Sequence, residues 1–212
     1  MSVDQSVASV ERDAAVAAGG RLAAEARRLS GLGWMRATSG NLSEVLATDP
    51  LRLAVTASGV DKGELQPESV VVVDADGEPV PVEGLAPLKP SDEAALHARI
   101  AAATGAGAVV HVHPLAAVVA ARRSPDGVRL RGLEMLKALG RSADDDEVLV
   151  PVLANSQDMQ ELADRFDAAH DPRTPGVVVA DHGLYVWGRD LVQARHRTES
   201  LEWLLEFHLR TA

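Results

Sequence analysis

The apolar residues of the chain follow two kinds of pattern, one typical of helices and one typical of strands. Apolar residues at near-helical spacing predict helices over residues 7–29, 91–103, 115–122, 133–139, 156–168 and 190–209. Short apolar runs bounded by Gly, Pro or Asp predict strands over residues 41–47, 52–56, 70–73, 108–113, 148–153, 177–180 and 184–187. Each of the first three strand segments is bounded by Gly, Pro or Asp, which predicts an antiparallel front half of the sheet.

Two helix starts can be proposed from capping chemistry. Ser91 is a good N-cap, and Asp92 and Glu93 after it would place negative charge at the positive end of the helix dipole. Asn155 or Ser156 is expected to open the helix at 156–168. The strand at 108–113 runs directly into a proline, which is typical of the first turn of a helix.

The two ends of the chain differ in character. Residues 1–12 are expected to form a frayed beginning of the first helix, which should end near Gly31 and Gly33. The last helix carries Trp203 and Phe207 among charged residues, and these rings are expected in the core or in a subunit contact.

Length and composition favour one α/β domain over residues 1–212, because 46% of the residues are hydrophobic and the chain is too short for two full cores. The formal charge of −10 argues against nucleic-acid or anionic membrane partners. The chain has no cysteine, so a metal would need nitrogen or oxygen ligands. The first twenty residues resemble no targeting segment, which predicts a cytoplasmic protein.

The strongest chemical signal is a set of three histidines. His111 and His113 are two residues apart in an apolar strand, so both imidazoles should point to one side of the sheet. His182 lies in a glycine-containing turn and could complete a three-nitrogen site with an open position, as in catalytic zinc centres. A single histidine is more often an ordinary hydrogen-bonded residue, and the adjacent pair is what favours a metal.

Two turns could bind an anion. Residues 38–41 and 56–62 combine glycine, hydroxyl side chains and one lysine, which together can hold a phosphate. Each turn taken alone is more typical of a simple loop. The candidate phosphate contacts are Ser39, Gly40, Asn41, Ser58, Gly59 and Lys62.

Two carboxylates are candidates for acid and base chemistry, Glu93 and Glu134. A carboxylate beside a metal-bound carbonyl compound can remove an acidified α-proton. Glu134 stands between Leu133 and Met135, an apolar setting that suits such a role. Either residue could equally be a surface glutamate of a helix.

Five short motifs occur in the order and approximate spacing of the class II (zinc-dependent) aldolase superfamily, and the chain resembles that family from about residue 14 to 209. Residues 132–139, 150–155 and 182–188 are most similar to its methylthioribulose-1-phosphate dehydratase branch. The loop before Asn41 lacks the glycine run of some dehydratases. The motifs are Ser39-Gly40-Asn41, Ser58-Gly59-Val60, Lys89-Pro90-Ser91-Asp92-Glu93, His111-Val112-His113 and His182-Gly183-Leu184.

This resemblance implies an α/β/α fold with a central, mainly antiparallel sheet, and a homotetramer with active sites near subunit interfaces. It also implies one Zn²⁺ per subunit on His111, His113 and His182. In the aldolases the residue matching Glu93 is a metal ligand or an acid/base, and in the dehydratases the residue matching Glu134 is the favoured catalytic carboxylate.

The function implied is dehydration of the sugar phosphate 5-methylthioribulose 1-phosphate to 2,3-diketo-5-methylthiopentyl 1-phosphate in methionine salvage. A fuculose- or rhamnulose-phosphate aldolase and a 4-epimerase are the alternatives that share the metal chemistry. A non-catalytic, adducin-like interaction module is the alternative from another class, and it has no need of three imidazoles.

Overall fold

The computed structural model describes residues 3–144 and 147–211 of the chain. Its centre is a seven-stranded sheet. The strands are β1 (Asn41–Thr48), β2 (Leu51–Thr56), β3 (Val70–Val73), β4 (Ala108–Val112), β7 (Val152–Leu153), β8 (Gly176–Val179) and β9 (Gly183–Gly188). They lie in the order β3-β2-β1-β4-β9-β8-β7, and only the β7–β8 pair is parallel. The predicted α/β class with a mainly antiparallel sheet is confirmed.

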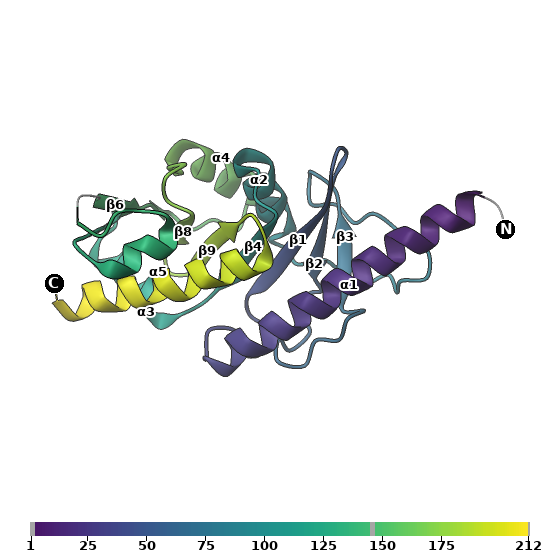
Figure 1. Ribbon diagram of the computed structural model, residues 1–212, viewed down its shortest axis with the longest axis horizontal. Coiled ribbons are helices and arrows are strands. Elements are labelled where there is room, and N and C mark those ends of the chain that lie inside the picture. The colour runs from purple at the N-terminus through teal and green to yellow at the C-terminus, as the bar shows by residue number, and fades with distance from the viewer. Residues whose placement is uncertain (1–2, 145–146, 212) are drawn as a thin grey trace.

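Helices cover both faces of this sheet (Figure 1). They are α1 (Val3–Gly31), α2 (Ala94–Thr104), α3 (Leu115–Arg123), α4 (Met159–Ala169) and α5 (Leu191–Thr211). Helices α1, α3 and α5 pack on one face, whereas α2 and α4 pack on the other. Both faces are apolar because side chains alternate along each strand. In β4, Val110 and Val112 pack into the core on the side of α1, α3 and α5, whereas Val109 packs into the core on the side of α2 and α4.

A small second sheet lies beside α5. It pairs β5 (Val128–Arg131) with β6 (Glu147–Val150), and the 3₁₀ helix η1 (Glu134–Leu139) lies between them in the chain. The single strand predicted at 148–153 is therefore wrong, because Pro151 has no N–H to continue a ladder and the chain changes sheets there. The alternation of buried and exposed residues in β5 was not recognised in the sequence.

Helix α1 begins at Val3, earlier than the predicted 7–29, and continues through its two adjacent glycines. Gly19 lies where the helix crosses the backbone of Pro67, and a Cβ atom there would come within 1.9 Å of the Pro67 carbonyl oxygen. The glycine therefore permits close packing of the helix and does not interrupt it.

Both proposed helix caps are wrong. Helix α2 follows Glu93, without a side-chain cap, and the Ser91 hydroxyl accepts hydrogen bonds from Asn41 (2.8 Å) and from the Glu93 N–H (3.3 Å) instead. Helix α4 is capped by Asp158, whose carboxylate accepts from the N–H groups of residues 160 and 161. Tertiary contacts and a better cap override the local signal in these two places.

The rings of Trp203 and Phe207 stack on each other with centroids 5.5 Å apart, but 42% and 36% of these residues stay exposed. They do not join the core of the subunit. Of the two locations that the sequence predicted, only a contact with another subunit remains. Within the described residues, no helix has both the length and the apolarity needed to cross a membrane.

Candidate metal centre and active site

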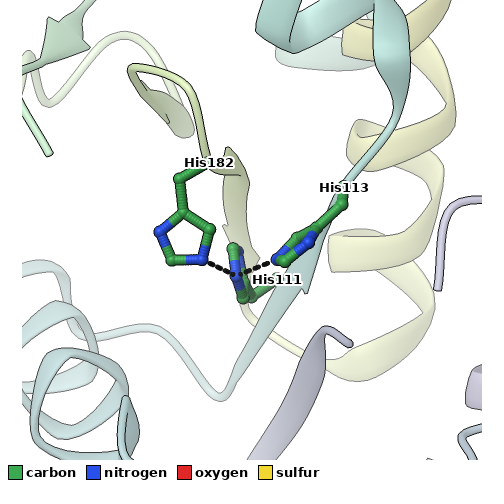
Figure 2. Close-up of side chains that lie close together, drawn as sticks. All are labelled: His111, His113 and His182. Carbon is green, nitrogen blue, oxygen red and sulfur yellow. Dashed lines mark hydrogen bonds between the residues drawn. The ribbon is translucent and has the colours of Figure 1, made fainter. Parts of the chain in front are cut away.

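Three histidines meet at one edge of the sheet (Figure 2). His111 lies in β4, His113 directly follows that strand, and His182 lies in the turn between β8 and β9. The Nε2 atom of His111 is 2.8 Å from Nε2 of His113 and 3.2 Å from Nε2 of His182. The predicted convergence of these rings is present in the structure.

Two contacts fix the central ring of this cluster. His111 is fully buried and stacks on Tyr185, with ring centroids 3.8 Å apart. Its Nδ1 atom is 3.2 Å from the carbonyl oxygen of Leu184. Since a carbonyl can only accept, Nδ1 carries a hydrogen, and Nε2 is the nitrogen that faces the other two imidazoles.

The donor set fits a divalent metal ion. One nitrogen each from His111, His113 and His182 lies within 4.8 Å of the other two, and imidazole nitrogens in such a group are typical ligands of divalent ions. Burial and the neighbouring His111 lower the pKa of His113 to about 3, so this ring is neutral at ordinary pH. Neutral imidazoles are the form that binds metal.

Glu93 lies beside the histidine cluster and contacts two of its imidazoles. Its Oε1 atom is 2.9 Å from Nε2 of His182 and 3.5 Å from Nε2 of His111. Asn41 donates a hydrogen bond to the other carboxylate oxygen. Burial opposes ionisation of Glu93, but the charge of His111 and hydrogen bonds from His111, His182 and Asn41 together hold its pKa well below the usual range.

A cavity of about 490 Å³ opens over these groups. Most of the predicted site residues line it, together with others that the sequence reasoning did not single out. The predicted residues in its lining are Ser39, Gly40, Asn41, Ser58, Lys62, Glu93, His113 and His182. The others include Ser91, Asn155, Met159 and Asp181.

Lys62 joins the two predicted anion-binding turns. Its buried Nζ atom donates to the carbonyl oxygens of Thr38 and Val60, each at 2.9 Å. Burial lowers the pKa of Lys62. The lysine thus holds the two turns against each other at the cavity wall, in addition to placing its charge there.

Some hydrogen-bond donors of the two predicted anion-binding turns already bind acceptors within the protein. Both the N–H and the hydroxyl of Ser39 donate to the Arg36 carbonyl, and the N–H of Ser58 donates to the Lys89 carbonyl. Asn41 is occupied by Ser91 and Glu93. Of the predicted phosphate contacts, those of Ser58 and Gly40 are therefore more important than the sequence suggested.

Three predicted site residues do not line the cavity: His111, which is fully buried within the histidine cluster, Gly59 and Glu134. The side chain of Glu134 is 77% exposed and pairs with Lys137 at 2.7 Å. The apolar setting expected for Glu134 is thus not found within one subunit, because η1 turns this residue outward between its two apolar neighbours.

Tyr185 is a site residue that the sequence reasoning missed. It faces His111 across the β4–β9 pair, and burial followed by the nearby Glu93 raises its pKa well above the usual value. The chain has one tyrosine, three residues after His182, and this position on the alternating strand was the available signal.

The fold, together with a histidine site that could hold a divalent metal ion, defines an α/β protein of the aldolase type. The model of the Class II Aldolase and Adducin N-terminal domain family matches residues 20–209. The chain belongs to this family, which confirms the resemblance found in the sequence.

Two curated relatives point to one branch within this family. The chain is 38% identical over 182 residues to a protein of Persephonella marina named methylthioribulose-1-phosphate dehydratase, covering 85% of this chain and 83% of that protein. It is 41% identical over 181 residues to a protein of the same name from a Sulfurihydrogenibium species, covering 84% and 83%.

A solved structure supports the fold. The L-fuculose-1-phosphate aldolase of Thermus thermophilus superposes with a TM-score of 0.68 at 28% identity, covering 91% of this chain and 92% of that chain. The three-histidine site of the present chain thus lies on a fold that also serves a sugar-phosphate aldolase.

Proposed function

We propose that this protein is a methylthioribulose-1-phosphate dehydratase, a hydro-lyase that converts 5-methylthioribulose 1-phosphate to 2,3-diketo-5-methylthiopentyl 1-phosphate in methionine salvage. The observation that carries the proposal is the cluster of three imidazoles and Glu93, of which His113, His182 and Glu93 line one cavity. The relatives at 38% and 41% identity that carry this name support the same substrate.

Zn²⁺ is the ion we propose for the site, one per subunit on His111, His113 and His182, where it would polarise the C2 carbonyl and acidify the proton on C3. Ser58, Gly40 and the Lys62-bound turns would orient the phosphate group. Holding the phosphate fixes the distance of C3 from the catalytic groups.

The carboxylate of Glu134 is proposed as the base that removes the C3 proton and then returns it to the departing C4 hydroxyl, so that one water leaves. The enol that remains becomes the 2,3-diketone by tautomerisation. Because Glu134 is exposed and does not line the cavity of its own subunit, we infer that it acts in the site of a neighbouring copy in a homotetramer. A cytoplasmic location and one domain per subunit stay predictions.

The test is incubation of the zinc-loaded protein with 5-methylthioribulose 1-phosphate and identification of the product. A diketone supports the dehydratase, two carbon fragments would instead establish an aldolase, and a C4 epimer an epimerase. Metal analysis of the purified protein separates all three from a non-catalytic interaction module, which should hold no stoichiometric zinc.

A further inference from the structure

We propose that Met159 forms the subsite for the methylthio tail of the substrate and sets the preference for it. The inference rests on the proposed function and adds the specificity of the same site. Met159 is the first residue of α4 and lines the cavity.

The strand order places Met159 on one side of the metal centre and the anion-binding turns on the other. The chain segments that follow β4, β7 and β8 leave the same edge of the sheet, because these three strands run in the same direction. The segment before β1 and the segment after β2 lie at that edge too. Across this edge the order is β2, β1, then β4 and β9 with the histidines, then β8 and β7.

These positions match the length of the proposed substrate. Neighbouring strands are about 5 Å apart, so the segment after β7 lies roughly 10 Å from β9. With the phosphate at the β1 and β2 side and C2 and C3 over the histidines, bonds of about 1.5 Å carry the terminal methyl about 5 Å beyond C3 toward β7. A methionine side chain reaching in from the start of α4 spans the remaining distance.

The chemistry of the lining points to the same residue. Among the described residues that line the cavity, Met159 has the one large apolar side chain, and the others are polar, charged or small. It is partly buried and packs against the core between α2, α4 and the sheet. A thioether is flexible and polarisable and can adapt to a methylthio group.

The segment that presents Met159 is held in place by several hydrogen bonds. Arg165 donates to the carbonyl oxygens of Ala154 (2.7 Å) and Asn155 (2.9 Å). The Ser156 hydroxyl accepts from the Asp158 N–H (3.1 Å) and donates to a carboxylate of α4 at 2.6 Å. The tail subsite is therefore built before substrate binds, which limits the ordering cost of binding.

The test compares kcat/KM for two substrates, 5-methylthioribulose 1-phosphate and 5-deoxyribulose 1-phosphate, which lacks only the S–CH₃ group. A group of this size in an apolar subsite changes kcat/KM by roughly tenfold or more. The ratio of the two values is expected to fall about tenfold in Met159→Gln and to stay within about threefold of the wild-type ratio in Met159→Leu. Each ratio is internal to one variant, so it does not depend on how much of the protein is folded.

Gln160→Ala is the matched control, since Gln160 is exposed on the next position of α4 and bonds Asp164. Its ratio should equal that of the wild type. An unchanged ratio in Met159→Gln overturns the tail subsite, and so does a wild-type enzyme that dehydrates both substrates equally well. If the zinc-loaded wild type yields diketone from neither substrate, the proposed function itself fails, and the two failures are thus distinguishable.

Discussion

The Glu93 carboxylate oxygen Oε1 lies 2.9 Å from Nε2 of His182, on the inner side of the histidine cluster. Asn41 holds the other oxygen of this carboxylate, so its position is set by β1 as well as by the start of α2. A carboxylate held in this way adds negative charge where the imidazole nitrogens converge. It thereby favours the binding of a cation and orients His182.

Glu93→Gln should therefore weaken metal binding. Loss of a carboxylate that supports the ligands typically costs about 10- to 100-fold in metal affinity. Competition with a chelator of known zinc affinity measures the change. Asp92→Asn is the control, because Asp92 is exposed and pairs with Lys89, and wild-type zinc affinity in Glu93→Gln would refute this role.

Gly183→Ala should disrupt the metal centre through the backbone. A Cβ atom at Gly183 would come within 2.5 Å of the Val112 carbonyl oxygen and 2.8 Å of a His113 ring carbon. The turn that carries His182 must then move away from β4, with a loss of about 1–3 kcal/mol in stability and of stoichiometric zinc. Thermal unfolding and metal analysis read the two effects, and Gly31→Ala, with open space at its Cβ, should change neither.

The parts of the site that follow from strand periodicity were predictable from the sequence. The two-residue spacing of His111 and His113 in a β-branched run determines the face on which both rings lie, whatever the rest of the fold. His182 could be added because its turn contains Gly183, which allows the close approach to β4 that the structure has.

The parts that depend on tertiary competition were not predictable. Ser91 is a good cap in isolation, yet its hydroxyl is used by Asn41, a residue fifty positions away in the chain. Glu134 has apolar neighbours in sequence, but η1 exposes it and leaves it beside Lys137. Local sequence carries no information about which of two nearby polar groups a distant strand will bind.

Lys62→Met should weaken phosphate binding through the turns that Lys62 holds together. The substitution removes two hydrogen bonds to carbonyl oxygens and one buried positive charge. We expect KM for the sugar phosphate to rise by about tenfold or more, with a loss of roughly 1–3 kcal/mol in stability. Steady-state kinetics and urea unfolding test both, and an unchanged KM would exclude Lys62 from substrate binding. Lys89→Met, at an exposed lysine, is the comparison.

His97 should make the stability of the protein fall as the pH is lowered. This residue is fully buried with Nδ1 2.8 Å from the Ser43 hydroxyl, and burial, followed by His111, lowers its pKa to about 3. Between pH 6.5 and 3 the unfolded chain binds a proton that the folded chain does not. The free energy of unfolding therefore loses nothing through His97 above pH 6.5. Below that pH it decreases toward pH 3, by up to about 1.4 kcal/mol per pH unit.

The measurement is urea unfolding of the metal-free protein from pH 7 to 4, wild type against His97→Asn. The pH dependence should be shallower in the variant, and the difference isolates His97 from the other histidines. Parallel curves for wild type and His97→Asn would contradict the assignment.

Glu134→Gln should abolish diketone formation without loss of zinc, because the residue does not touch the histidine cluster of its own subunit. If a neighbouring copy supplies Glu134, then Glu134→Gln and His113→Asn chains should complement each other. Each is inactive alone, but a co-expressed mixture contains sites with an intact metal centre from one chain and an intact carboxylate from the other. Random assembly gives such sites about a quarter of the total, and activity near that level is expected. A mixed oligomer without activity would show that Glu134 does not act across a subunit interface.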